Sequence, residues 1–368
     1  MMKTSSGERM DYTLFTACVA LTLFGILMVY SASPVLAFEE HGDSAYYFKR
    51  QVVWAILGLA VGFYFFRRNP EQLKKIMVPG LTVSILLLFA VHIPHLGRRV
   101  GGATRWFNLG PFSFQPFEIV KIFYVIYLAD LFADDKNPFS RKLIRSAGVT
   151  GIIALGLIFQ KDLGATVIIM MIYMAMLLVA GVNIWIFAGL IGAAVMAVIV
   201  LIKAEPYRMK RVMMFLDPWS DYYGAGWQTI QSLIAVGSGG IFGVGFSNSQ
   251  QKYLYLPTPH TDYIFSIIGE EWGLIGATVV LAGFFMVLSR GVFIAINAQE
   301  KFNKFMALGL TLTIITQVCI NVAVTIGLMP SKGTTLPFLS YGGSSLLVAC
   351  IAMGMLLAIS KTAYGRAK

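Results

Sequence analysis

The hydrophobic residues of the chain fall into long runs that short polar segments separate. A helix that crosses the hydrocarbon core of a bilayer needs roughly 20 mostly apolar residues. Irregular backbone cannot face hydrocarbon, because its amide groups would have no hydrogen-bond partners. We therefore interpret each run as a membrane-spanning helix. The pattern predicts ten spans, at residues 12–36, 52–67, 76–95, 119–133, 146–160, 164–181, 183–202, 263–289, 305–328 and 345–361.

The distribution of Lys and Arg predicts how these spans are oriented, because cytoplasmic loops carry an excess of both residue types. Basic clusters follow the second, fourth, eighth and tenth runs, at 67–75, 136–145, 290–304 and 361–368. All four fall on the same side as the N-terminus. That side is predicted to be the cytoplasm, with both termini there. The fold expected for residues 1–368 is one all-α polytopic membrane domain.

Four segments then lie on the outer side, at 97–118, 161–164, 203–262 and 329–344. The longest is an extracytoplasmic loop between the seventh and eighth spans. These segments carry basic residues, against the usual trend, although a loop of about 60 residues is a permitted exception. Either loops simply tolerate these charges, or the charges hold an anionic, membrane-anchored ligand such as a diphosphate.

Composition agrees with lipid as the main solvent of the protein surface. Of the 368 residues, 57% are hydrophobic and 13% are charged, whereas a soluble protein carries about a quarter charged residues. The net charge of +11 is spread over loops, which favours lipid headgroups or phosphates over nucleic acid as partners. The three cysteines all lie in apolar runs and the four histidines form no ligand pattern. The sequence therefore predicts neither a disulfide framework nor a Cys/His metal site.

Ionisable residues at the span boundaries are candidates for function. Glu118 and Lys121 open the fourth span three residues apart, so they share one face of a helix. Asp162 ends the fifth span. Lys121 could pair with Asp162 or with Glu118 as a structural ion pair, or the group could line a substrate cavity.

Asp262 stands at the start of the eighth span, in the motif HTD. From the pattern alone, the favoured role is a helix cap, since an acidic residue at a helix N-terminus accepts backbone N–H groups and complements the helix dipole. The segment 329–345 contains several prolines and glycines, which predicts a shaped turn and no helix. Its hydroxyl groups could form hydrogen bonds with a polar headgroup, or the turn could be a tight connection packed on other helices.

Seven motifs that follow one another along the chain carry a family resemblance. They are GATRW at 102–106, QPFEIVK at 115–121, QKDLG at 160–164, RVMMFLDP at 211–218, GWQTIQS at 226–232, LP with HTD within 256–262, and TLPFLSYGGSS at 335–345. In this combination the sequence resembles the SEDS proteins (shape, elongation, division and sporulation), the peptidoglycan glycosyltransferases of bacteria. The stretch KGTTLPF at 332–338 resembles the division and sporulation branch more than the elongation branch. The chain departs from the family pattern at two positions. Phe117 stands where the family commonly has Ser, and Lys161 where it commonly has Pro. Both positions lie beside the charged residues Glu118, Lys121 and Asp162.

The resemblance implies a ten-span protein of the bacterial plasma membrane that polymerises lipid II into glycan strands at the outer face, in cell division or related wall synthesis. It implies Asp262 as general base. The residues expected to bind substrate are Arg105, Glu118, Lys121, Asp162, Arg208, Arg211, Lys252, His260, Ser340 and Ser344. No cofactor is implied with certainty; a divalent cation, Mg²⁺ or Mn²⁺, could assist the leaving diphosphate, and no ligands for it are identified.

The expected partners are lipid II, the nascent lipid-linked glycan, a class B penicillin-binding protein that crosslinks the product, and proteins of the division or elongation complex. Two alternatives remain open at this point. A lipid II flippase would use a charged central cavity equally well. A non-catalytic scaffold would only recruit the transpeptidase.

Overall fold

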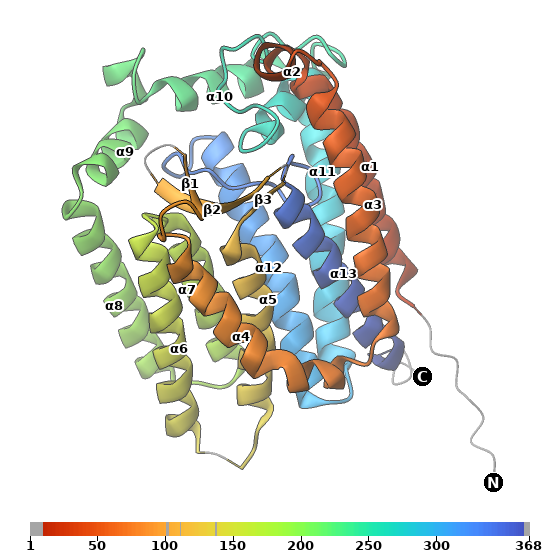
Figure 1. The fold of residues 1–368 in the computed structure, drawn as a ribbon, viewed down its shortest axis with the longest axis vertical. Helices are drawn as coiled ribbons and strands as arrows, with labels where there is room; N and C mark the ends of the chain where they lie inside the picture. Colours follow the sequence, from red (N-terminus) through yellow and green to blue (C-terminus); the bar gives the residue numbers. More distant parts are fainter. Residues whose placement is uncertain (1–9, 101–102, 111, 137, 364–368) are drawn as a thin grey trace.

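The computed structural model describes residues 10–100, 103–110, 112–136 and 138–363. The predicted cytoplasmic position of the two termini falls on residues 1–9 and 364–368, which lie outside the described residues. Long helices run side by side through most of the molecule, while short helices and a small sheet gather at one end (Figure 1). This end holds the segments predicted to face the outside.

The long helices of the described chain correspond to the ten apolar runs. They are α1 (Tyr12–Ala32), α3 (Tyr46–Arg67), α4 (Leu73–Ala90), α5 (Pro116–Ala133), α6 (Phe139–Phe159), α7 (Leu163–Val179), α8 (Ile184–Lys203), α11 (Ile264–Asn297), α12 (Lys301–Thr325) and α13 (Gly343–Ala363). Within the described ranges, eight are long and apolar enough to cross a membrane. The other two are α5, which carries three charged residues, and α7, which has 17 residues. The protein is therefore a multi-pass membrane protein.

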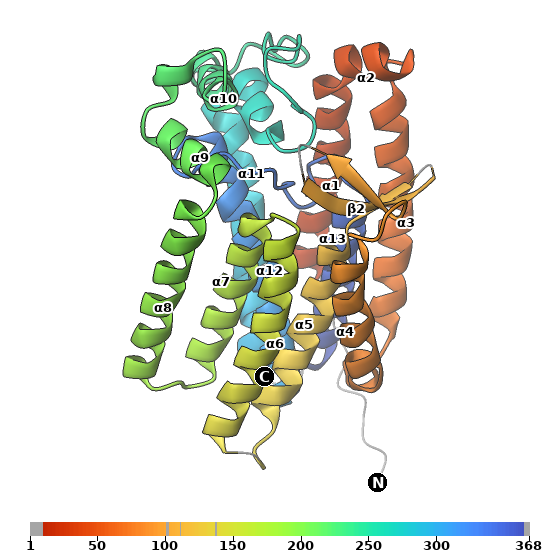
Figure 2. The same cartoon turned by 60° about the vertical axis from the view of Figure 1, so that its left-hand side comes forward.

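The helices divide into a packed centre and a lipid-facing edge. Most of α13 is buried, and it packs along α3 so closely that a Cβ at Gly354 would lie 2.0 Å from the carbonyl oxygen of Gly62. Small residues at such crossings let two membrane helices approach. By contrast, α8 buries none of its residues although it is apolar throughout, and it stands at the edge beside α7 (Figure 2). A helix that is apolar all round and unburied is solvated by lipid.

The segment 97–118 is not the irregular loop that an all-α fold predicts. It forms an antiparallel sheet of three strands, β1 (Gly97–Val100), β2 (Ala103–Leu109) and β3 (Phe112–Phe114), in the order β1–β2–β3. The all-α prediction is wrong in this respect. The reason is that β2 and β3 are rich in aromatic and β-branched residues, which favour strands.

The segment 203–262, predicted to be extracytoplasmic, contains three short helices, α9 (Pro206–Leu216), η2 (Pro218–Asp221) and α10 (Trp227–Ser238). The remaining short helices are α2 (Pro34–His41) and η1 (Pro70–Gln72). The part after α10 is irregular but fixed to α11. The backbone N–H groups of Val244 and Gly245 donate to the carbonyl oxygens of Glu270 and Glu271 at 3.0 and 3.1 Å.

The side chains of Glu270 and Glu271 complete this attachment. Glu271 accepts hydrogen bonds from the Ser31 hydroxyl of α1 at 2.6 and 2.8 Å. Glu270 accepts from the Ser249 hydroxyl and, at 2.8 Å, from the backbone N–H of Gln250. Because both carboxylates are buried, these partners compensate for the lost water. The two acids thus join the outer loop to the helices below it.

Candidate active site

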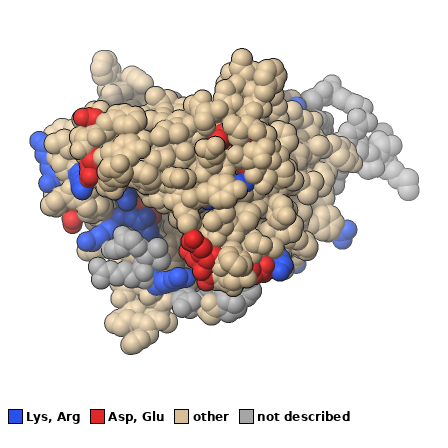
Figure 3. All heavy atoms as spheres, turned by 90° about the horizontal axis from the view of Figure 1, so that it is seen from above, with Lys and Arg blue, Asp and Glu red and all other residues tan. Residues whose placement is uncertain are grey.

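A polar pocket of about 190 Å³ lies at the end of the bundle that holds the segments predicted to face the outside. Its walls come from β2, the N-terminal ends of α5 and α7, α12, Asp262 and the loop 332–335. The lining residues are Arg105, Trp106, Gln115, Phe117, Glu118, Asp162, Ala165, Asp262, Gln317, Lys332, Gly333, Thr334 and Thr335. Viewed from this end, basic side chains gather around a hollow with acidic ones beside it (Figure 3).

Asp262 faces this pocket and does not cap a helix. Helix α11 begins at Ile264, and the residue before it, Tyr263, makes no side-chain capping bond. The capping interpretation is therefore wrong, because the chain at Asp262 has not yet turned into the helix. Burial raises the pKa of the Asp262 carboxyl to about 6, although the nearby positive charge of Lys332 opposes this.

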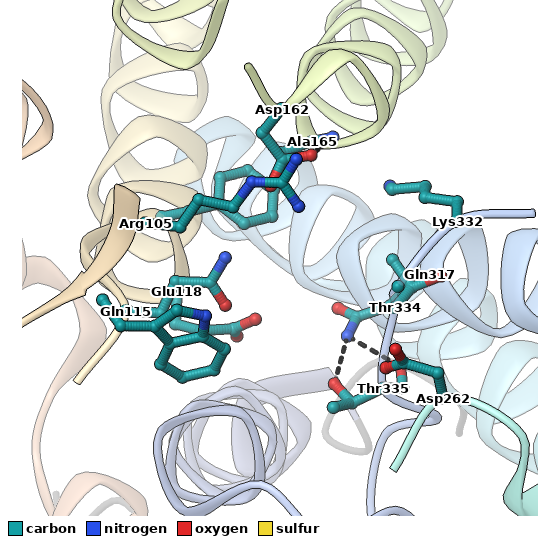
Figure 4. Close-up of a pocket in the computed structure, with 13 residues that line it drawn as sticks. Arg105, Gln115, Glu118, Asp162, Ala165, Asp262, Gln317, Lys332, Thr334 and Thr335 are labelled. Carbon is teal, nitrogen blue, oxygen red and sulfur yellow. Dashed lines mark hydrogen bonds and ion pairs between the residues drawn. The ribbon is translucent and has the colours of Figure 1, made fainter. Parts of the chain in front are cut away.

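Arg105 and Asp162 form one side of the pocket (Figure 4). The Arg105 Nε lies 3.4 Å from Asp162 Oδ2, and its Nη2 donates to the carbonyl oxygen of Lys161 at 2.6 Å. The other carboxylate oxygen, Asp162 Oδ1, accepts from the backbone N–H of Ala165 at 2.9 Å and so caps α7. Strand β2 and the turn between α6 and α7 thus hold one cation at the pocket in a fixed position.

Lys121 pairs with Glu118, and the alternative pair with Asp162 is not formed. The Lys121 Nζ lies 2.8 Å from Glu118 Oε2, and it donates to Gln317 Oε1 at 2.7 Å. Residues three apart on a helix share a face, whereas Asp162 is already occupied by Arg105 and the helix cap. Glu118 lines the floor of the pocket, while Lys121 lies beneath it.

Lys332 is the main residue at the pocket that the sequence reasoning did not select. Its Nζ is buried and has no hydrogen-bond partner within the described chain. The side chain passes over Gly164, where a Cβ would lie 1.8 Å from Lys332 Cε. Burial lowers the pKa of the Lys332 ammonium to about 8, against the opposing effect of the Asp162 carboxylate. The sequence signal that could have identified Lys332 is its position in a turn that contains prolines and glycines.

Besides Lys121, three predicted basic residues lie outside the pocket lining. Arg211 donates to the carbonyl oxygen of Ser331 at 3.1 Å, next to Lys332, and its charge reaches Asp262. Arg208 is buried and donates to Tyr207 and to the backbone of α8 at Leu201. Lys252 forms a buried ion pair with Glu271 at 3.4 Å. Since Arg208 and Lys252 are engaged in these contacts, the structure supports a structural role for both.

His260, Ser340 and Ser344 also lie behind the pocket wall. His260 is buried and stacks on Tyr47 with ring centroids 4.3 Å apart. Burial lowers its pKa to about 4, so the ring is neutral at pH 7. The Ser340 hydroxyl donates to the carbonyl oxygen of Thr261. The Ser344 hydroxyl is buried without a partner among the described residues.

The donor set does not form a metal site. No group of three or more His, Cys, Asp or Glu within the described residues is close enough to hold a metal ion. Glu118 and Asp162 are each paired with a basic side chain, which leaves Asp262 as a lone carboxylate. The divalent cation stays a prediction.

The arrangement combines one half-buried carboxyl with cations fixed across a pocket. A carboxyl whose pKa is raised toward neutrality suits proton abstraction from a hydroxyl group. Fixed cations stabilise negative charge that develops on a leaving group. Among the described residues, Arg105 and Lys332 are the cations that line the pocket with Asp262.

Comparisons with known proteins identify the family of the chain. The FtsW/RodA/SpoVE family model, described as a cell cycle protein, matches residues 12–365. The "Probable peptidoglycan glycosyltransferase FtsW" of Trichlorobacter lovleyi is 43% identical over 356 residues, which cover 95% of this chain and 93% of that protein.

Two solved structures share the fold. A chain from a peptidoglycan synthase complex that coordinates polymerization and crosslinking matches with a TM-score of 0.80 and 30% identity, over 96% of this chain and 98% of that one. The rod shape determining protein RodA of Thermus thermophilus matches with a TM-score of 0.70 and 25% identity, over 98% of both chains. The chain belongs to the FtsW/RodA/SpoVE family, the SEDS family that its motifs resemble.

Proposed function

We propose that the pocket is the active site of a peptidoglycan glycosyltransferase of the FtsW type, which polymerises lipid II during cell division. The observation that carries this proposal is the Asp262 carboxyl, half-buried and facing Arg105 and Lys332 in one pocket. The names of the relatives supply the reaction class. The pocket supplies groups whose chemistry fits that reaction.

Asp262 is the proposed general base. The attacking 4-hydroxyl of the acceptor N-acetylglucosamine is a poor nucleophile at neutral pH, so a positioned carboxylate that takes its proton accelerates the reaction. The oxygen then bonds to C1 of the donor N-acetylmuramic acid. The bond from C1 to the diphosphate oxygen breaks, and undecaprenyl diphosphate leaves with the electron pair.

Arg105 and Lys332 are the proposed partners of the leaving diphosphate. Negative charge builds on its bridging oxygen in the transition state, and preorganised cations stabilise it. Arg105 is held by Asp162 and by the backbone of Lys161, so little reorganisation is needed. The unpartnered Nζ of Lys332 is free to take a phosphate oxygen as its hydrogen-bond acceptor. A diphosphate is a good leaving group, which is why one carboxyl suffices.

The pH dependence of the rate should reflect these two groups. Asp262 must be ionised to accept a proton, and its pKa is about 6. Lys332 must be charged to stabilise the diphosphate, and its pKa is about 8. The value of kcat/KM should therefore rise with pH up to about 6 and fall above about 8. Lys332→Gln should lower the plateau and remove the alkaline limb, whereas an alkaline limb that persists in this variant would exclude Lys332 as its origin.

Ten spans with the pocket on the outer side of the bacterial plasma membrane are the topology we propose. The basic clusters of the opposite side support it. Cysteines at Asn248 and Tyr223, which are exposed at the pocket end, should react with an impermeant thiol reagent added to intact cells. A cysteine at Ser140, exposed at the other end, should not. Labelling of Ser140 alone would reverse the orientation and place the pocket in the cytoplasm.

The substrate pair and the crosslinking partner complete the proposal. A class B penicillin-binding protein is the expected partner, since the similar solved chain belongs to a complex that couples polymerization to crosslinking. Donor and acceptor are both anchored in one leaflet, which lowers the entropic cost of bringing them together.

The proposal is tested with the purified full-length chain, a class B partner whose transpeptidase is blocked, and fluorescent lipid II. Glycan strands resolved by electrophoresis are the expected product, and the partner alone is the control. Absence of polymer with an active partner would favour the scaffold. Headgroup translocation in vesicles that survives Asp262→Asn, without any polymer, would favour the flippase.

A further inference from the structure

The segment that carries Asp262 is held on one side by the loop before α13. The carbonyl oxygen of His260 accepts a hydrogen bond from the backbone N–H of Tyr341 at 2.8 Å. The next carbonyl, that of Thr261, accepts one from the Ser340 hydroxyl. These bonds fix the backbone up to Asp262, and the carbonyl of Asp262 itself takes a donor from a different element.

That donor is Asn321, near the outer end of α12. Its Nδ2 donates to the carbonyl oxygen of Asp262 at 2.8 Å and also to the carbonyl oxygen of Thr334. A primary amide carries two N–H bonds, so one side chain satisfies both acceptors. Asn321 is 1% exposed, and water cannot easily replace it there.

The two segments that Asn321 joins carry the groups that meet in the pocket. One segment presents the Asp262 carboxyl, and the other presents Lys332 and Gly333. They are already in close contact, because a Cβ at Gly333 would lie 2.8 Å from Asp262 Oδ2. A small increase in their separation would therefore admit water to the carboxyl.

One turn earlier, α12 presents a second amide to the same loop. The Gln317 Nε2 donates to the carbonyl oxygen of Thr335 at 2.9 Å. Residues four apart lie on one face of a helix, so Gln317 and Asn321 bind adjacent carbonyls of the loop. Only Asn321 also reaches the segment of Asp262.

We infer that Asn321 is a positioning residue that sets the separation between Asp262 and the 332–334 loop and limits the access of water to the carboxyl. The inference rests on the proposed role of Asp262 as base. Asn321 does not line the pocket, so it acts through the two carbonyls it binds. Its removal should change the rate of the chemical step and leave substrate binding nearly intact.

The pH profile distinguishes this role from general stabilisation. The charged groups whose fields act on Asp262 are Lys332, Arg105, Asp162 and Arg211, and burial is the largest cause of its raised pKa. Separation of the segments would hydrate the carboxyl and lower its pKa toward the ordinary value. The acid limb of kcat/KM would then move to lower pH. A loss of folded protein would reduce the rate and leave the limb in place.

The test is Asn321→Leu in the purified full-length chain with its partner and lipid II, because Leu has nearly the same size and no donors. We expect kcat to fall at least ~10-fold, with KM within about twofold, since a transition-state group is displaced and binding is not. The acid limb should move down by roughly one pH unit. Asn303→Leu, a buried amide in the first turn of the same helix, is the matched control and should change neither quantity.

Hydrogen exchange gives a readout that needs no activity. In Asn321→Leu, the exchange of backbone amide hydrogens should become faster in both 258–263 and 332–336. In Asn303→Leu, exchange should stay as in the wild type in both segments. If Asn321→Leu does not fold, Asn321→Gln is measured in the same way; its longer arm should displace both carbonyls and produce smaller changes of the same sign. Wild-type kcat, acid limb and exchange in the folded variant would overturn the inference.

The two proposals fail in different ways. Wild-type polymerisation by Asp262→Asn would remove the base assignment and with it the basis of the inference. An inactive Asp262→Asn together with an unaltered Asn321→Leu would overturn the role of Asn321 alone.

Discussion

Asp262→Asn should reduce lipid II polymerisation by at least ~10²-fold, the usual loss when a general base is removed. Asn has nearly the same size as Asp, and the structure gives Asp262 no capping bond that the change could weaken. Thermal stability and binding of the partner should therefore stay near those of the wild type. The measurement is glycan product per unit time from the purified variant with its partner, beside a melting curve.

Two further variants sharpen this result. Asp262→Glu should be strongly impaired as well, because the extra methylene moves the carboxylate away from the position that it holds beside Gly333. Asp43→Asn is the matched control, since the Asp43 side chain, between α2 and α3, is 42% exposed and lies outside the pocket. A wild-type rate for Asp262→Asn would eliminate the base assignment.

Lys121→Met should be the most destabilising single change at the pocket. The variant leaves Glu118 buried beside an apolar side chain, and breaking a buried ion pair in this way costs about 3–5 kcal/mol. The pair lies 2.8 Å apart with both side chains at most 4% exposed. Unfolding in detergent should therefore begin at a much lower temperature, and polymerisation should fall with the folded fraction.

The double variant Glu118→Gln/Lys121→Met should recover most of the lost stability, because no buried charge is left unpaired. Lys49→Met provides the comparison, as Lys49 forms an exposed pair with Asp43 at the same 2.8 Å. Exposed pairs contribute little, so its melting curve should not move. Equal shifts for Lys121→Met and Lys49→Met would contradict the assigned role of the buried pair.

The long helices and several local features could be predicted from the sequence because their causes are local. A long apolar run must form a helix within hydrocarbon, and each of the ten runs falls mostly within a long helix of the described residues. The Glu118–Lys121 pair follows from a spacing of three on one helix. The irregular 329–342 turn follows from its prolines and glycines. The family motifs indicated where polar residues matter.

Which residues line the pocket depends on the tertiary structure. Arg105, Asp262 and Lys332 come from a strand and two loops far apart in the sequence. Periodicity describes one helix at a time, so it could not show that Lys252 turns toward Glu271 or that Asp162 is taken by Arg105. A basic residue in an outer loop looks the same in a sequence whether it binds substrate or completes a buried pair.

The sequence by itself determined a multi-pass helical membrane protein of the SEDS family, because hydrophobic length and motif order are properties of the chain read in one dimension. Only the tertiary structure decided which charges meet. Burial raises the pKa of the Asp262 carboxyl and lowers the pKa of the Lys332 ammonium. Burial is produced by segments that pack together from distant positions, and it is therefore absent from any local pattern.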